Sequence, residues 1–177
     1  MSSPSPFPFP REYHFPPFFT PQPNLTTRHA QQTKWSALIL AYARHHRIFR
    51  LSVSTASETD LFYNARINRR LSIPDIHTLI NFMRKDGRAE YESASRAASV
   101  ASGWDVVFLH WKKPEEWAAL IEKYVEDTAQ KGSVLTVYEI KLHGLDHDVL
   151  LKALNILVKK GRAQIFGSDD SLGVKFF

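Results

Sequence analysis

Two pairs of ionisable side chains have a spacing that could support chemistry. His143 and His147 are four residues apart, one helical turn, a spacing that brings two imidazoles together as metal ligands. Asp169 and Asp170 are adjacent and resemble a carboxylate pair for general acid–base work. However, Gly144 interrupts the first pair, the chain contains no Cys, and Asp is favoured in turns for local backbone bonding. We therefore expect a surface His pair and a turn, and we predict no catalytic, cofactor-binding or metal-ligating residue.

The amino-terminal segment indicates recognition of a partner. Eight of the ten prolines and five of the twelve phenylalanines fall within residues 1–23. Such proline density predicts an extended polyproline II backbone. Because this backbone is already restricted, a partner can bury the aromatic rings that project from it at little cost in ordering entropy. We predict a docking element for a partner's groove, formed by five residues: Phe15, Pro16, Pro17, Phe18 and Phe19. The alternative is that these rings fold back onto the chain itself.

The elements behind this segment occur twice. The motif Trp35, Leu38, Ile39 and Tyr42, spaced as the apolar face of a helix over 27–46, returns 82 residues later as Trp117, Leu120, Ile121 and Tyr124. A second pair of blocks, 85–91 and 159–165, matches at an offset of 74. In each copy an N-cap candidate, Ser72 or Asp146, opens the helix that leads into this block. The helix should then end at Gly87 or Gly161. The sequence thus predicts a tandem repeat.

Each copy is predicted to contain a helix, a short strand, two further helices and a hairpin, which is the order of a winged helix. In the first copy the middle elements are expected at 51–53 and 61–71, and in the second at 134–136 and 137–141. The hairpins are expected at 88–92 with 106–111, and at 163–166 with 173–177. The predicted fold class is α+β, with a docking tail (1–23) and two winged helices (24–112 and 113–177). The 93–103 loop and the 2–10 segment are expected to be mobile and peripheral.

The charge distribution leaves one rival function open. Net charge is +5 overall, but residues 1–113 carry 15 basic and 8 acidic groups, against 8 and 10 in residues 114–177. Winged helices commonly read DNA with their third helix, so the first copy could bind nucleic acid weakly. The net-acidic second copy is a poor duplex binder. No stretch reaches the roughly 18 apolar residues of a membrane span, and no signal pattern opens the chain, so we expect an intracellular protein.

Four blocks of sequence carry a family resemblance. They are FPPFFT-x-QPN at 15–24, WKKPEEW at 111–117, HGLD at 143–146 and GVKFF at 173–177. Together and in this order they resemble the small winged-helix subunit of the ESCRT-II family. The resemblance implies a non-enzymatic scaffold, present twice in a complex with two larger subunits, in the cytoplasm and recruited indirectly to the endosomal membrane.

The resemblance also implies how the parts are used. The family's docking element for the larger subunits falls on Pro16, Pro17, Phe18 and Phe19, and Phe19 lacks the hydroxyl of the Tyr found in some members. The second winged helix is implied to bind the amino-terminal helix of an ESCRT-III subunit, which starts the sorting of ubiquitinated cargo into multivesicular bodies. The alternative function is a nucleic-acid-binding tandem winged-helix protein.

Overall fold

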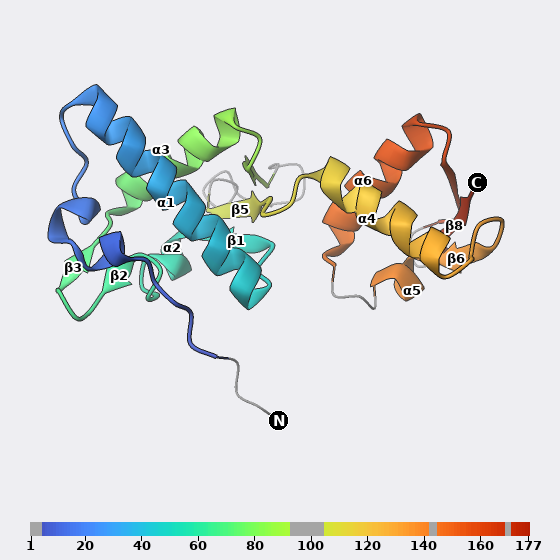
Figure 1. Ribbon diagram of the computed structural model, residues 1–177, viewed down its shortest axis with the longest axis horizontal. Helices are drawn as coiled ribbons and strands as arrows, with labels where there is room; N and C mark the ends of the chain where they lie inside the picture. The colour runs from blue at the N-terminus through green and yellow to red at the C-terminus, as the bar shows by residue number, and fades with distance from the viewer. Residues whose placement is uncertain (1–4, 93–104, 142–144, 169–170) are drawn as a thin grey trace. The chain divides into compact units, whose positions relative to one another are not determined.

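The computed structural model describes residues 5–92, 105–141, 145–168 and 171–177. The chain divides into two compact units, Met1–Trp111 and Lys112–Phe177 (Figure 1). Both contain helices and a three-stranded antiparallel sheet, as the predicted α+β class requires. Three features of the sequence analysis fall outside the described residues: His143 of the histidine pair, the Asp169-Asp170 pair, and the 93–103 loop.

The first unit is organised around the long helix α1 (Leu25–His46). It begins two residues before the predicted start because the side chain of Asn24 accepts a hydrogen bond from the Thr27 amide and caps the first turn. Arg47, in the left-handed conformation with φ of 55°, ends it. Helix α3 (Ile73–Lys85) packs against α1 (Figure 1).

The predicted helix at 61–71 is wrong. The second helix of the first unit is α2 (Val53–Ala56), which starts directly after strand β1 (Arg50–Ser52). The 61–71 segment instead forms a small hairpin, β2 (Tyr63–Asn64) and β3 (Arg69–Arg70), because Asn68 adopts φ of 49° and reverses the chain. An Asp105 carboxylate fixes α2 in its place by accepting from the Ser54 amide at 2.8 Å.

The β2–β3 hairpin accounts for the difference in length between the two copies. The offset is 84 between the strand ends Ser52 and Thr136, but 74 between the N-caps Ser72 and Asp146. The first copy therefore has ten more residues at this point, and they form the β2–β3 hairpin and its flanks.

The second unit repeats the element order without the hairpin. It contains α4 (Pro114–Asp127), β6 (Val134–Thr136), α5 (Val137–Lys141), α6 (His147–Lys159), β7 (Ala163–Phe166) and β8 (Gly173–Phe176). Its strand order β6-β8-β7 corresponds to β1-β5-β4 in the first unit, where β4 is Ala89–Tyr91 and β5 is Val106–Leu109. Both units thus have the order of elements expected of a winged helix.

The repeated cap residues behave as the sequence predicts. Ser72 accepts from the Asp75 amide and Asp146 from the amides of Asp148 and Val149. Gly87 and Gly161 follow the two helices with φ of 70° and 69°, a backbone conformation that is strained for residues with a Cβ atom. The same local signals therefore begin and end the third helix of each unit.

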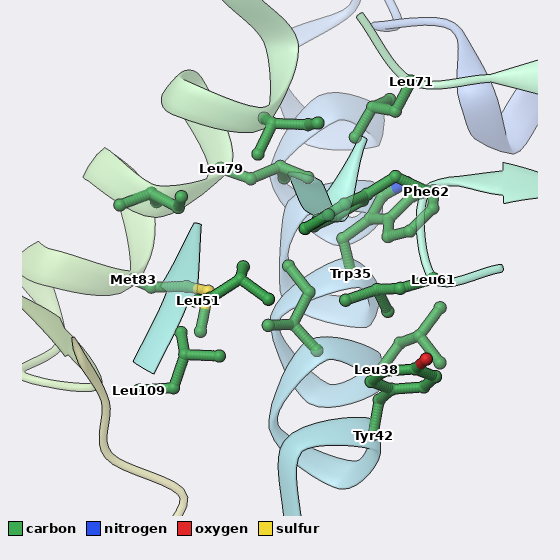
Figure 2. Close-up of a cluster of buried hydrophobic side chains, with 14 of the residues drawn as sticks. Trp35, Leu38, Tyr42, Leu51, Leu61, Phe62, Leu71, Leu79, Met83 and Leu109 are labelled. Carbon is green, nitrogen blue, oxygen red and sulfur yellow. The ribbon is translucent and has the colours of Figure 1, made fainter. Parts of the chain in front are cut away.

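The core of the first unit is built from α1, α3 and the segments between them. Figure 2 shows side chains of α1 meeting those of α3, together with residues from β1, β5 and the hairpin flanks: Trp35, Leu38, Tyr42, Leu51, Leu61, Phe62, Leu71, Leu79, Met83 and Leu109. Trp35 and Phe62, each at most 1% exposed, are among the largest fully buried side chains. Within the part of the chain that the structure describes, no helix is long and apolar enough to cross a bilayer.

Candidate docking surface

The aromatic tail is not extended polyproline II as predicted. It forms two 3-10 turns, η1 (Arg11–His14) and η2 (Pro16–Phe19). Pro16 and Pro17 occupy the first two positions of η2. Proline lacks a backbone N–H, but an N–H group at these positions would have no acceptor within the turn, so no hydrogen bond is lost. The turn is closed by hydrogen bonds from the Phe18 amide to the Phe15 carbonyl at 2.9 Å and from the Thr20 amide to the Pro17 carbonyl at 3.2 Å.

Phe18 and Phe19 belong to the core of the first unit. They are 6% and 4% exposed, and Phe18 stacks on Trp35 with ring centroids 4.4 Å apart. Phe19 meets the same indole edge-on at 5.3 Å. These two rings thus follow the alternative stated above and fold back onto the chain itself, while the docking role of the five residues stays a prediction. The tail thus covers part of the buried Trp35 indole.

Polar contacts fix the backbone of the tail. The Gln31 side chain on α1 reaches the carbonyls of Phe18 and Thr20, each at 2.9 Å, from its Nε2. The Trp35 indole Nε1 donates to the Phe18 carbonyl, also at 2.9 Å. Because the Phe18 carbonyl lies beside the apolar core, its bond from Trp35 removes the penalty of burying it. The tail is thus attached through its backbone as well as its rings.

Tyr13 provides a second attachment point. Its ring is 3% exposed and stacks on Phe9, and its hydroxyl donates to the Asp60 carbonyl. Burial, with the nearby Asp60 carboxylate adding to it, raises the pKa of Tyr13 to about 12. The side-chain Nδ2 of Asn64 on β2 donates to the Tyr13 carbonyl at 2.8 Å. The β2–β3 hairpin, which forms in place of the helix predicted at 61–71, therefore holds the tail.

The 2–10 segment is less peripheral than predicted, as far as residues 5–10 describe it. Phe7 packs edge-on against Phe9 and Tyr42, with centroids 4.9 and 5.3 Å away. His45 Nε2 lies 2.9 Å from the Ser5 carbonyl. These contacts extend the attachment of the tail along α1.

What remains exposed is a short ridge. Phe15 is 61% exposed, and Pro16 and Pro17 that follow it are also exposed. The ridge has Tyr13 anchored on one side and Phe18 on the other, so its backbone is already ordered. The five predicted docking residues thus divide into three that face solvent and two that hold the ridge in place.

The second unit has exposed apolar side chains of its own. The large ones at least 38% exposed are Leu120, Val134, Tyr138, Val158, Phe166 and Phe177. On the sheet, Thr136 and Phe166 both pair with Gly173. A Cβ atom at Gly173 would meet the Phe166 ring at 2.8 Å and the Val134 side chain at 3.4 Å, so both side chains lie over this glycine. Glycine thus allows an apolar sheet surface to form there.

Several basic residues of the first unit are engaged with neighbouring side chains. Arg70 pairs with Glu58 and lies over the Tyr63 ring, and Arg84 lies over the Tyr91 ring at 5.0 Å. Arg50 pairs with Glu92 at 2.9 Å. Such partners reduce the charge that the first unit presents to phosphates, which weakens the case for nucleic acid. In the described parts of both units, no group of three or more His, Asp or Glu could hold a metal ion.

Comparison with known proteins places this architecture in a family. The family model described as "ESCRT-II complex subunit" matches residues 12–154. Vacuolar protein-sorting-associated protein 25 of Danio rerio is 37% identical, with 97% of this chain and 99% of that protein covered. The chain belongs to the ESCRT-II complex subunit family.

Further relatives agree. The Dictyostelium discoideum protein of the same name is 38% identical, covering 97% of this chain and 96% of its own. The crystal structure of subunit VPS25 of ESCRT-II has a TM-score of 0.81 at 29% identity, covering 95% of this chain and 98% of that one. A VPS22/VPS25/VPS36 complex contains a chain with a TM-score of 0.79 at 27% identity, covering 94% and 98%. As an ESCRT-II subunit the chain is a non-enzymatic component of an endosomal trafficking complex.

Proposed function

We propose that this chain docks on the two larger ESCRT-II subunits through the Phe15–Pro17 ridge. The observation that carries the proposal is a phenylalanine 61% exposed to water in a segment flanked by the buried rings of Tyr13 and Phe18. Leaving such a ring in solvent is unfavourable unless a partner covers it, and aromatic groups dominate the energetics of many interfaces. VPS22 and VPS36 accompany the similar VPS25 chain in the solved complex, which supports larger subunits of this kind as the partner.

The anchoring of the ridge favours tight binding. Two prolines restrict the backbone, and Phe18 and Phe19 fix its carboxyl-terminal end against Trp35. A partner that covers Phe15 therefore orders little additional chain, so more of the interaction free energy appears as affinity. Phe19 acts here as an anchor, which explains why this position can lack a hydroxyl.

The second unit is proposed to bind the amino-terminal helix of an ESCRT-III subunit. Its sheet carries Val134 and Phe166 over Gly173 in exposed positions, which suits the apolar face of an amphipathic helix. In this way the chain would link ESCRT-II to ESCRT-III and start the sorting of ubiquitinated cargo into multivesicular bodies. The chain reaches the endosomal membrane indirectly, through its partners, with two copies in each complex.

Two variants separate the two contacts. Phe15→Ser should abolish co-purification with the larger subunits while leaving ESCRT-III binding intact, and Phe166→Ser should do the reverse. Each variant is the control for the other because both replace an exposed ring in a different unit. Retained assembly of Phe15→Ser with the larger subunits would contradict the docking proposal. The mass of the purified complex tests the copy number.

A further inference from the structure

A cavity opens directly beside the ridge. It has a volume of about 230 Å³ and lies between the tail, α1 and α3. Its floor is apolar, formed by four residues of the core: Phe18, Trp35, Leu71 and Leu79. Phe18 is thus shared between the two features, because its carbonyl and ring anchor the ridge and also line the cavity.

The rim of the cavity is polar. Arg28 on α1 and Asp75 and Thr78 on α3 border it, and the Arg28 Nε is already committed to the Gln22 carbonyl at 2.7 Å. The Asp75 carboxylate accepts from Ser72 through one oxygen, Oδ2. An apolar floor below carboxylate and hydroxyl acceptors fits a side chain that is apolar along its body and carries a donor at its tip.

The size of the cavity fits one side chain. A cavity of about 150 Å³ lined by apolar residues is enough to take a benzene molecule. The cavity here is larger than that by about half, which accommodates one substituted ring. A floor built from the stacked Phe18 and Trp35 rings favours an aromatic group over an aliphatic one.

Leu25 extends the same surface. It is 76% exposed, in the first turn of α1, three residues before Arg28 and seven before Gln32, both of which line the cavity. Residues spaced in this way share one face of a helix. Leu25 therefore lies on the face of α1 that borders the cavity.

We propose that this cavity is the second half of the docking surface and receives one tyrosine side chain from a larger ESCRT-II subunit, with Leu25 covering the ring. The proposal rests on the proposed function. The ridge enters the partner while the partner's ring enters the cavity, so the two contacts together fix the orientation of the chain. The tyrosine hydroxyl donates to Asp75 or Thr78 at the rim.

The test blocks the cavity without touching the ridge. Gln32→Trp places an indole at the mouth, and Thr33→Trp, at the neighbouring exposed position outside the lining, is the matched control. Binding to the purified larger subunits is measured by calorimetry, with urea unfolding to confirm that both variants fold. We expect Gln32→Trp to weaken binding at least about tenfold, a change of about 1.4 kcal/mol, and Thr33→Trp to change it by less than about twofold.

A second pair of variants keeps the test decisive if Gln32→Trp fails to fold. Thr78→Trp approaches the same cavity from α3, and Asn81→Trp is its control one turn along that helix. If Phe15→Ser loses binding but both cavity variants bind as the unaltered chain does, the cavity inference is overturned and the ridge proposal stands. If Phe15→Ser also binds normally, the ridge proposal and the cavity inference are both overturned. Replacing the partner tyrosine that enters the cavity by Ala should reduce the affinity to that measured for Gln32→Trp. If every tyrosine of the larger subunits can be replaced without loss of affinity, the inference is overturned.

Discussion

The ring of Phe18 lies flat on the indole of Trp35, with centroids 4.4 Å and planes 5° apart, and the indole Nε1 donates to the Phe18 carbonyl at 2.9 Å. One tail residue is thus bound to the core through both its side chain and its backbone. The tail is therefore part of the first folded unit, and only its outward ridge remains available for a partner.

Removing this ring should destabilise the chain. Phe18→Ala is expected to lower the free energy of unfolding by about 3–5 kcal/mol, the usual range for truncating a buried phenylalanine. Phe15→Ala, which truncates an exposed ring, should change it by no more than about 0.5 kcal/mol. Urea unfolding followed by tryptophan fluorescence measures both. Equal effects for the two variants would show that Phe18 is not a core residue in solution.

Alkaline pH should loosen the tail. The folded-state pKa of Tyr13 is about 12, above the ordinary value of 10.0, because its burial disfavours the phenolate. Between these values the unfolded chain releases a proton that the folded chain retains, so the stability is fully present below pH 10 and falls as pH rises to about 12. Tyr42 adds to this fall, because burial and its bond to Asp60 raise its pKa too.

The measurement is urea unfolding at several pH values from about 8 to 11. Tyr13→Phe should lose stability less steeply above pH 10, since one of the tyrosines with a raised pKa is gone. An unchanged slope in this variant would show that Tyr13 ionises as freely in the folded chain as in the unfolded one.

The two helix-ending glycines should respond alike to substitution. A Cβ atom at Gly87 or Gly161 would have no neighbour within 4 Å, so steric overlap contributes nothing. The left-handed backbone alone should cost about 1–2 kcal/mol in Gly87→Ala and in Gly161→Ala. Thermal unfolding of the single variants tests this, and asparagine, which tolerates that conformation better, should restore part of the loss. A neutral alanine at either position would contradict the assigned backbone.

The second unit should fold without the first. Residues 112–177 contain a complete sheet and their own buried side chains, including Leu150, Leu154 and Val174. Domains of about 55–65 residues often fold alone. A fragment of 112–177 should show dispersed NMR signals and a cooperative urea transition, whereas 24–111, which lacks Phe18 and Phe19, should unfold at much lower urea than 1–111. A fragment of 112–177 without a transition would disprove this independence.

Duplex DNA should not bind measurably. Arg50 and Arg70 are held in ion pairs and the second copy is net acidic, so the charge left for phosphates is small. A gel-shift titration at low salt should show no complex. Binding that weakens steeply with added salt would revive the nucleic-acid alternative.

Most of the architecture could be predicted from local signals. The repeated Trp-x2-Leu-Ile-x2-Tyr motif marks the first helix of each unit, and Ser72 and Asp146 cap the third helices as expected. The segment 61–71 was predicted as a helix from its place in the repeat, between the first strand and the third helix. Its hairpin depends on Asn68 and on bonds to distant residues, such as Asn64 to the Tyr13 carbonyl.

The same distinction applies to the docking residues. Local sequence patterns were enough to predict that an aromatic, proline-rich tail precedes two copies of one α+β unit, because each pattern is encoded within a few consecutive residues. The inward position of Phe18 and Phe19 and the outward position of Phe15 could be found only from the packing, since they depend on contacts with Trp35 in a helix further along the chain. Burial is a property of packing between distant segments, so neighbouring phenylalanines with the same chemistry can have opposite roles.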